Sequence, residues 1–139
     1  MIIGYTTGAY DLFHIGHLNL LKNAKSMCDH LIVGISTDEL IQKVKNKSPV
    51  IPFVERVDIV SAIKYVNTVV SQSDYDKMAA WERYKFHIMF VGDDWKGSAQ
   101  WDAHEKKFET INVRTIYFPY TRHTSSTKIN NILENLMIP

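Results

Sequence analysis

The sequence has little of what marks disulfide-rich, secreted or membrane-spanning proteins. Its 139 residues include a single cysteine, Cys28, which excludes an intramolecular disulfide and suits a reducing compartment. No apolar run of about 18 residues is present, and no basic stretch followed by an apolar one opens the chain. We therefore expect a cytoplasmic protein without a membrane anchor.

The chain also has almost no net charge and no repeated segments. The formal net charge is +1 at pH 7, which argues against a nucleic-acid coat or a polybasic membrane patch. No internal repeat, low-complexity tract or interdomain linker interrupts the chain. With 45% hydrophobic residues, residues 1–139 are predicted to form a single domain with its own core.

Strand-like and helix-like segments alternate along the whole chain. Apolar and β-branched runs predict strands over residues 1–7, 30–36, 66–70, 87–91 and 112–118. Helical spacing predicts helices that start at residues 15 and 37 and others over 53–65, 73–84, 99–108 and 126–136. This alternation is typical of an α/β fold, and we expect a Rossmann-like, doubly wound, five-stranded parallel sheet.

The run His14-Ile15-Gly16-His17 lies where the first predicted strand and turn give way to a helix. Such a unit directs free backbone N–H groups and the positive end of the helix dipole beyond the strand. His14 and His17 are three residues apart and share one face of the first helical turn, while Gly16 permits a close approach. The run predicts a phosphate-binding site at the carboxyl edge of the sheet.

Four segments resemble, in order, the motifs of the HxGH nucleotidyltransferase superfamily. Residues 8–17, with the sequence GAYDLFHIGH, resemble the HxGH signature. The later segments resemble motifs of the glycerol-3-phosphate cytidylyltransferase branch, and they are Ile35–Glu39, Val91–Trp95 and Ser125–Ile129. The corresponding turns follow the first, second, fourth and fifth strands and fall at the carboxyl end of the sheet, so a single composite site is expected.

The resemblance implies that a phosphate oxygen of an acceptor attacks the α-phosphorus of CTP and releases pyrophosphate. Because that nucleophile is already anionic, no general base is required, and catalysis comes from positioning and charge stabilisation. His14, His17 and Lys47 are the catalytic residues that the resemblance implies. Lys45 is expected to contact the phosphates beside Lys47, with Lys43 as the alternative to Lys45.

The resemblance also assigns binding residues. Those expected to bind the nucleotide are Gly8, Ala9, Tyr10, Asp11, Gly16, Lys45, Gly92, Asp94, Tyr120, Arg122, Ser125, Ser126 and Thr127. Those expected to bind the acceptor are Lys45, Lys64, Tyr75 and Trp95. Asp11 has three interpretations: it holds the turn, helps to bind a metal, or caps the following helix. Because the sequence shows no clustered carboxylates, Mg²⁺ is expected to bind through the triphosphate oxygens.

Several positions depart from the family pattern. The family's threonine before the aromatic-Asp pair is Ala9, a tryptophan is Tyr75, and an arginine is Tyr120, with a positive charge returning at Arg122. A phenol cannot replace a guanidinium fork without changing what is bound. Glycerol 3-phosphate is the default acceptor, and phosphocholine, phosphoethanolamine, a polyol phosphate or a phosphoramidate such as phosphoglutamine are alternatives.

Two other functions stay open at this point. An adenylyltransferase would carry the same HxGH run, because that run contacts phosphates and not the base. A nucleotide-binding module without catalysis is the third possibility, since a fold does not fix a function. The expected partners are CTP, a small phosphorylated acceptor and a second copy of the chain, because the family commonly forms homodimers through the segment that Lys64–Val70 resembles.

Overall fold

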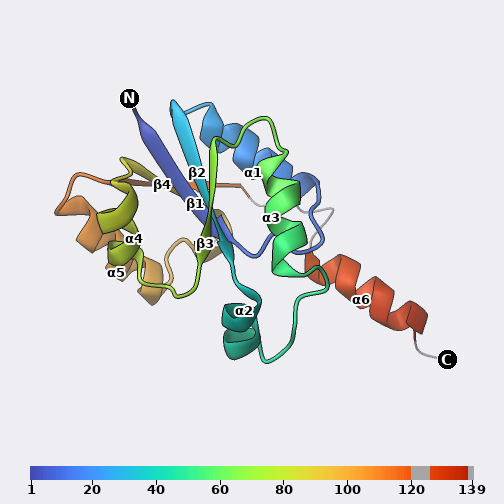
Figure 1. Cartoon of the computed structure of the whole chain (residues 1–139). Coiled ribbons are helices and arrows are strands. Elements are labelled where there is room, and N and C mark those ends of the chain that lie inside the picture. The colour runs from blue at the N-terminus through green and yellow to red at the C-terminus, as the bar shows by residue number, and fades with distance from the viewer. Residues whose placement is uncertain (120–125, 138–139) are drawn as a thin grey trace.

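The computed structural model describes residues 1–119 and 126–137. Within this part of the chain, five parallel strands form a sheet in the order β3-β2-β1-β4-β5 (Figure 1). They are β1 Ile3–Gly8, β2 His30–Ser36, β3 Thr68–Gln72, β4 Ile88–Gly92 and β5 Arg114–Phe118. Because the chain order reverses at β1, between β2 and β4, the prediction of a doubly wound parallel sheet is confirmed.

Helices lie on both faces of this sheet (Figure 1). The elements are α1 Ile15–Lys25, α2 Asp38–Lys45, α3 Phe53–Ser61, α4 Lys77–Tyr84, the 3₁₀ turn η1 Asp93–Trp95, α5 Ala99–Glu109 and α6 Ser126–Met137. Side chains of α1 and α3 join one core cluster, and side chains of α4 and α5 join a second. Helices α2 and α6 instead lie beyond the carboxyl ends of the strands, where the motif-bearing turns were expected (Figure 1).

The two cores follow from alternation along the central strands. Leu31, Val33 and Ile35 of β2 point into the cluster under α1 and α3, whereas Ile32 points into the cluster under α4 and α5. Full burial of side chains of this size stabilises a fold by about 1.5–3 kcal/mol each. A strand with both faces covered reads as a continuous apolar run, which explains why the predicted bounds 30–36 match β2.

Two helix boundaries differ from the predicted ones by four residues, and the others agree within one. Helix α3 ends at Ser61 and not at residue 65, because Ile63 and Val66 donate to carbonyls only three residues back and turn the chain toward β3. Helix α4 begins at Lys77 and not at residue 73, because the Asp76 side chain accepts the Ala79 N–H at 3.0 Å and forms the cap. Both predictions read turn residues as helix.

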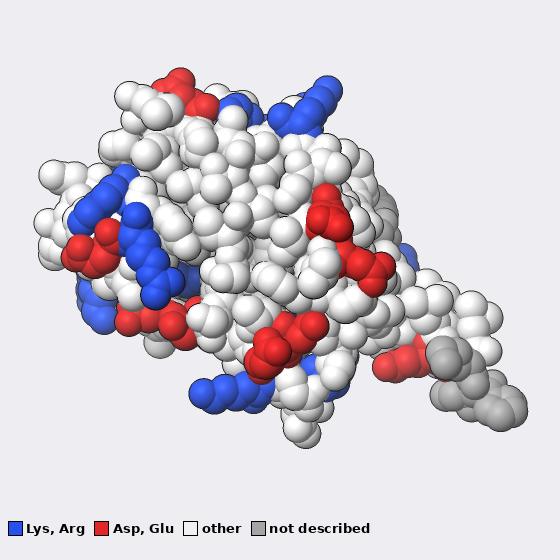
Figure 2. All heavy atoms as spheres, viewed as in Figure 1, with Lys and Arg blue, Asp and Glu red and all other residues white. Residues whose placement is uncertain are grey.

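The surface has no strongly charged face in the view of Figure 2. Lysine, arginine, aspartate and glutamate side chains are scattered around its edge, and its middle has none of them. No helix of the described residues is long and apolar enough to cross a membrane.

Candidate active site

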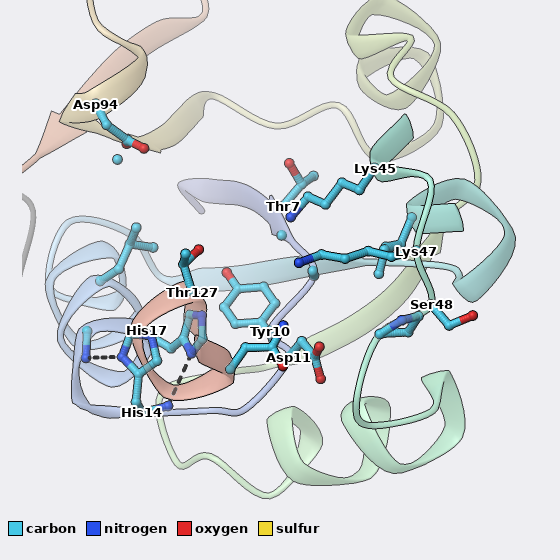
Figure 3. A pocket seen from close by; sticks show the side chains of 18 of the residues that line it. Thr7, Tyr10, Asp11, His14, His17, Lys45, Lys47, Ser48, Asp94 and Thr127 are labelled. Carbon is cyan, nitrogen blue, oxygen red and sulfur yellow. Dashed lines mark hydrogen bonds between the residues drawn. The ribbon is translucent and has the colours of Figure 1, made fainter. Parts of the chain in front are cut away.

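A cavity of about 420 Å³ opens at the carboxyl edge of the sheet, which is the size of an ordinary small-ligand site. Its lining includes twelve of the predicted site residues: Gly8, Ala9, Tyr10, Asp11, His14, Gly16, His17, Lys45, Lys47, Gly92, Asp94 and Thr127. These residues come from the turn after β1, from α1, from the end of α2 and the loop after it, from the end of β4 and the following η1, and from α6 (Figure 3). The topology therefore brings together distant segments that the motifs singled out.

The turn between β1 and α1, residues 8–14, forms the floor of this cavity. Tyr10 and Leu12 have positive φ angles of 53° and 52°, which are uncommon for side chains of their size. A Cβ atom on Gly8 would lie 2.9 Å from the ring of Tyr10, so only glycine leaves room for that ring. Burial raises the pKa of Tyr10, which keeps this wall of the cavity uncharged.

The two histidines close the N-terminus of α1. Nδ1 of His14 accepts the Gly16 N–H at 3.0 Å, and Nδ1 of His17 accepts the His14 N–H at 3.1 Å. Together they form a capping box, so the cap is His14, and the interpretation of Asp11 as the helix cap is wrong. Because both Nδ1 atoms accept, each neutral ring carries its proton on Nε2 and keeps a hydrogen-bond donor for a ligand.

These imidazoles are neutral at physiological pH. Burial lowers the pKa of His17 to about 3, with a smaller contribution from neighbouring His14, and burial also lowers the pKa of His14. The ring centroids lie 4.0 Å apart, so two positive charges here would repel each other. The pair therefore offers uncharged N–H donors in the first turn of a helix, beside its free backbone N–H groups.

Lys45, Lys47, Ser48 and Pro49 line the side of the cavity that faces this turn, and we call residues 45–49 the lysine segment. Lys45 is the last residue of α2, and Asn46 ends the helix with a left-handed φ of 55°. The ammonium groups of Lys45 and Lys47 extend into the cavity (Figure 3). Lys43 does not line it, which favours the pair Lys45 and Lys47 over the alternative.

Asp11 connects the turn to the lysine segment. Its Oδ2 accepts the Val50 N–H and its Oδ1 accepts the Ile51 N–H, both at 2.8 Å. Asp11 was expected to hold the turn, and these two hydrogen bonds instead join the turn to a loop about forty residues away. Hydrogen bonds from N–H groups to a carboxylate are charge-assisted and stronger than neutral ones.

The remaining predicted residues do not all reach the cavity. Trp95 is 48% exposed and Tyr75 is 39% exposed, and neither lines it. Lys64 lies between the end of α3 and the start of β3, at the amino end of the parallel strands and away from the cavity. Its Nζ is 5.3 Å from the Tyr65 ring centre. Ser126 is the first residue of α6. Tyr120, Arg122 and Ser125 lie outside the described residues.

Sequence reasoning missed two buried cations. Arg56 is fully buried and donates to three backbone carbonyls and to Asp38. Lys77 is also buried, and its Nζ donates to Thr7 Oγ1 at 3.0 Å and to Gln72 Oε1 at 3.3 Å. Arg56 lies four residues before the inward Val60 on α3, and this helical spacing was the available signal.

Lys77 lies directly behind the wall of the cavity, because Thr7 lines that wall. Both of its hydrogen-bond acceptors are neutral oxygens, and burial lowers the pKa of Lys77 to about 8 while Asp74 raises it less.

Other lining residues that the sequence did not indicate are Thr7, Leu20, Ile41, Ser48, Pro49, Pro119 and Asn130. Apolar members of this set lie between the motifs and carry no motif of their own.

No group of three or more histidine, cysteine, aspartate or glutamate side chains lies close enough to hold a metal ion within residues 1–119 and 126–137. The carboxylates that line the cavity are Asp11 and Asp94. Asp11 already accepts two backbone N–H groups. Such a donor set fits a divalent cation that is bound mainly by the oxygens of a polyphosphate, with Asp94 as the protein ligand.

The fold and the cavity define an α/β protein in which a helix N-terminus and two lysines face one cavity, an arrangement complementary to phosphate groups. Residues 5–132 match the family model described as cytidylyltransferase-like. The chain belongs to this family of HxGH nucleotidyltransferases, which confirms the resemblance of its motifs.

Individual relatives agree on the family and differ in their substrates. The chain is 35% identical over 135 residues to the glycerol-3-phosphate cytidylyltransferase of Bacillus spizizenii, covering 94% of this chain and 96% of the relative. It is 30% identical over 130 residues to the FAD synthase of Pyrococcus horikoshii, covering 93% and 88%. A lipopolysaccharide core biosynthesis protein from Thermoplasma volcanium has a similar fold, with a TM-score of 0.72 and 22% identity over 89% of this chain and 99% of that one.

Proposed function

We propose that this protein transfers CMP from CTP to a small phosphorylated acceptor and releases pyrophosphate. The observation that carries this proposal is the convergence of hydrogen-bond donors on one cavity: His14, His17, Lys45, Lys47 and the N-terminal turn of α1. A cavity with this many donors and cations is complementary to a polyphosphate. CTP is favoured over other nucleotides by the 35% identity to glycerol-3-phosphate cytidylyltransferases over nearly the full chain.

In the proposed reaction, a phosphate oxygen of the acceptor forms a bond to the α-phosphorus as the bond from that phosphorus to the β-phosphate oxygen breaks. The electron pair leaves with pyrophosphate, and no proton has to be removed from the nucleophile. The non-bridging α-phosphate oxygens, which carry negative charge, would accept hydrogen bonds from Nε2–H of His14 and His17. Lys45 and Lys47 would neutralise charge on the transferring and leaving phosphates.

A divalent cation such as Mg²⁺ would neutralise charge on the triphosphate, with Asp94 of the cavity wall as its protein ligand. The part of the chain that the structure describes offers no three-ligand cluster for it. The protein's own contribution is then to orient the triphosphate through the helix N-terminus, the two histidines and the two lysines.

For the acceptor, we propose glycerol 3-phosphate as the first candidate, with Lys77 as the cation that attracts its phosphate. Lys77 is buried beside the lining residue Thr7 and has only neutral hydrogen-bond partners. A buried ammonium group whose hydrogen-bond acceptors are neutral oxygens, with Asp74 offsetting only part of its charge, favours the approach of an anion. The same chemistry would serve phosphocholine, phosphoethanolamine, a polyol phosphate or phosphoglutamine, and the product would be a CDP-activated precursor for a surface polysaccharide or a lipid headgroup.

A second candidate function is adenylyl transfer, and the observation that favours it is the 30% identity to the FAD synthase of Pyrococcus horikoshii. The experiment that separates the two is a matrix of CTP and ATP against phosphorylated acceptors with Mg²⁺. Pyrophosphate release and product mass are measured for each pair. Turnover with CTP and an acceptor from the panel supports the proposal. Turnover with ATP and an acceptor, but with no acceptor when CTP is the nucleotide, overturns it. Calorimetric CTP binding without any pyrophosphate release would instead indicate a binding module.

We also propose that the protein forms a homodimer through the β3 edge of the sheet. β3 is the outermost strand on its side, and its free edge can pair with or pack against another chain. Val54 and Ile59 of neighbouring α3 are 70% and 41% exposed. Light scattering of the purified chain should give twice the monomer mass, and a monomer at micromolar concentration would contradict this proposal.

A further inference from the structure

Arg56 of α3 is fully buried and does not line the cavity, but its side chain donates hydrogen bonds to the segments around the cavity. Its Nε donates to the Ile51 carbonyl at 2.9 Å, and its Nη1 donates to the carbonyls of Ala9 at 2.7 Å and Ser36 at 2.8 Å. Its Nη2 forms an ion pair with Asp38 at 2.7 Å. Four hydrogen bonds therefore use four of the five N–H donors of a guanidinium group.

The acceptors of Arg56 belong to the pieces of chain that carry the phosphate-binding side chains. Ala9 lies in the turn that leads to the histidines, and Ile51 lies just beyond the lysine segment. Asp38 is the first residue of α2, whose last residue is Lys45. Arg56 thus contacts both ends of the stretch that holds the lysines, as well as the turn that faces it.

Asp11 adds a second connection between the same two pieces. It accepts the N–H groups of Val50 and Ile51, so Ile51 is bound through its N–H by Asp11 and through its carbonyl by Arg56. Asp38 also accepts the Phe53 N–H at 3.2 Å. The end of the lysine segment is therefore fixed to the turn by side chains and not by backbone pairing.

We propose that Arg56 is a positioning residue that sets the distance between the histidine turn and the lysine segment, so that Lys47 meets the phosphates held by His14 and His17. This inference rests on the proposed phosphate-transfer function. Arg56 contacts no substrate, and it acts through the backbone of Ala9 and Ile51. A displacement of about 1 Å in such a constellation can lower a rate about 100-fold.

The test is a double-mutant cycle in the full chain. Arg56→Lys keeps the charge but cannot maintain the fork of hydrogen bonds, and kcat/KM should fall about 100-fold. Lys47→Ala should cost about 30-fold in the wild type and less than about threefold in the Arg56→Lys background, because Lys47 is already misplaced there. A full loss from Lys47→Ala in both backgrounds would assign Arg56 a purely structural role and overturn the proposal.

Two further variants keep the test decisive. Arg114→Lys, an exposed arginine on β5, is the matched control and should change neither rate nor melting temperature. If Arg56→Lys does not fold, Asp38→Asn is used in its place. Asp38 is 42% exposed and does not line the cavity, and its replacement by asparagine removes the negative charge that pairs with Arg56. Its cycle with Lys47→Ala is read by the same criterion.

Amide hydrogen exchange without any substrate separates this inference from the proposed function. The Val50 and Ile51 amides should exchange at least about tenfold faster in Arg56→Lys, while α5 amides should be unchanged. Unchanged exchange at Val50 and Ile51 would overturn the positioning role even if the enzyme turns over CTP. Faster exchange in a protein that turns over no nucleotide would support the connection and overturn the proposed function alone.

Discussion

The histidine turn and the lysine segment face the same cavity, yet contacts of different range hold them in place. His14 and His17 are fixed by hydrogen bonds to N–H groups two or three residues away. The lysine segment is fixed by Asp11 and Arg56, which reach across 39 to 40 residues and 47 residues of sequence. One side of the site is locally encoded, and the other depends on the completed sheet.

This difference predicts how each side responds to change. Because the histidine cap is local, a substitution there should alter chemistry without disturbing the rest of the fold. Because the lysine segment is held through the side chains of Asp11 and buried Arg56, distant substitutions should alter it as strongly as substitutions within it.

His17→Asn should lower kcat by about 100- to 1000-fold, with little change in melting temperature. The asparagine carbonyl can accept the His14 N–H in place of Nδ1, but no N–H remains at the position of Nε2. Loss of one such donor to a developing negative charge costs about 100- to 1000-fold. His17→Ala should lose the same activity and, through the missing cap, about 1 kcal/mol of stability. Near-normal turnover in either variant would exclude a catalytic role for His17.

The local side of the site could be predicted from the sequence for the same physical reason. The strand, the turn and the residues of the capping box lie within fifteen residues of one another, and β2 could be read from its buried apolar run. The burial of Lys77 could not be predicted, and that of Arg56 was indicated only by its spacing from Val60, because their partners, such as Ala9 and Thr7, are brought near only by the sheet topology. The same limit applies to Lys64, Tyr75 and Trp95, which the resemblance assigned to the acceptor and which do not line the cavity.

Lys47→Ala should raise the nucleotide KM and lower kcat/KM about 30-fold, whereas Lys43→Ala should leave both within about twofold of wild type. The two lysines lie in the same basic stretch, but Lys47 lines the cavity and Lys43 does not. Removal of a cation that contacts a phosphate loses a charge-assisted hydrogen bond. Initial rates at varied nucleotide concentration provide the measurement. Equal effects of the two substitutions would mean that the stretch acts only through its overall charge.

Lys77→Met should raise the acceptor KM about tenfold at pH 7 and leave kcat nearly unchanged. Because burial lowers the pKa of Lys77 to about 8, the wild-type acceptor KM should also rise between pH 8 and 9, as the ammonium group loses its proton. The variant has no such group and should lack this pH dependence. Lys107→Met on α5, an exposed position, is the matched control. An acceptor KM that Lys77→Met does not change would place the acceptor elsewhere.

The smallest effect concerns stability in mild acid. The pKa of His17 is about 3 in the folded state and about 6.5 when unfolded, so the folded state binds fewer protons between these values. Its stabilising contribution is therefore complete above pH 6.5 and is lost as the pH falls toward 3. Between pH 7 and 5.5 this amounts to about 1 kcal/mol, and His14 contributes in the same direction. Urea unfolding at the two pH values should show the wild type losing about 1 kcal/mol more than His17→Asn. An equal loss in both proteins would mean that His17 accepts a proton in the folded state as readily as in the unfolded one, and that burial does not keep this imidazole neutral.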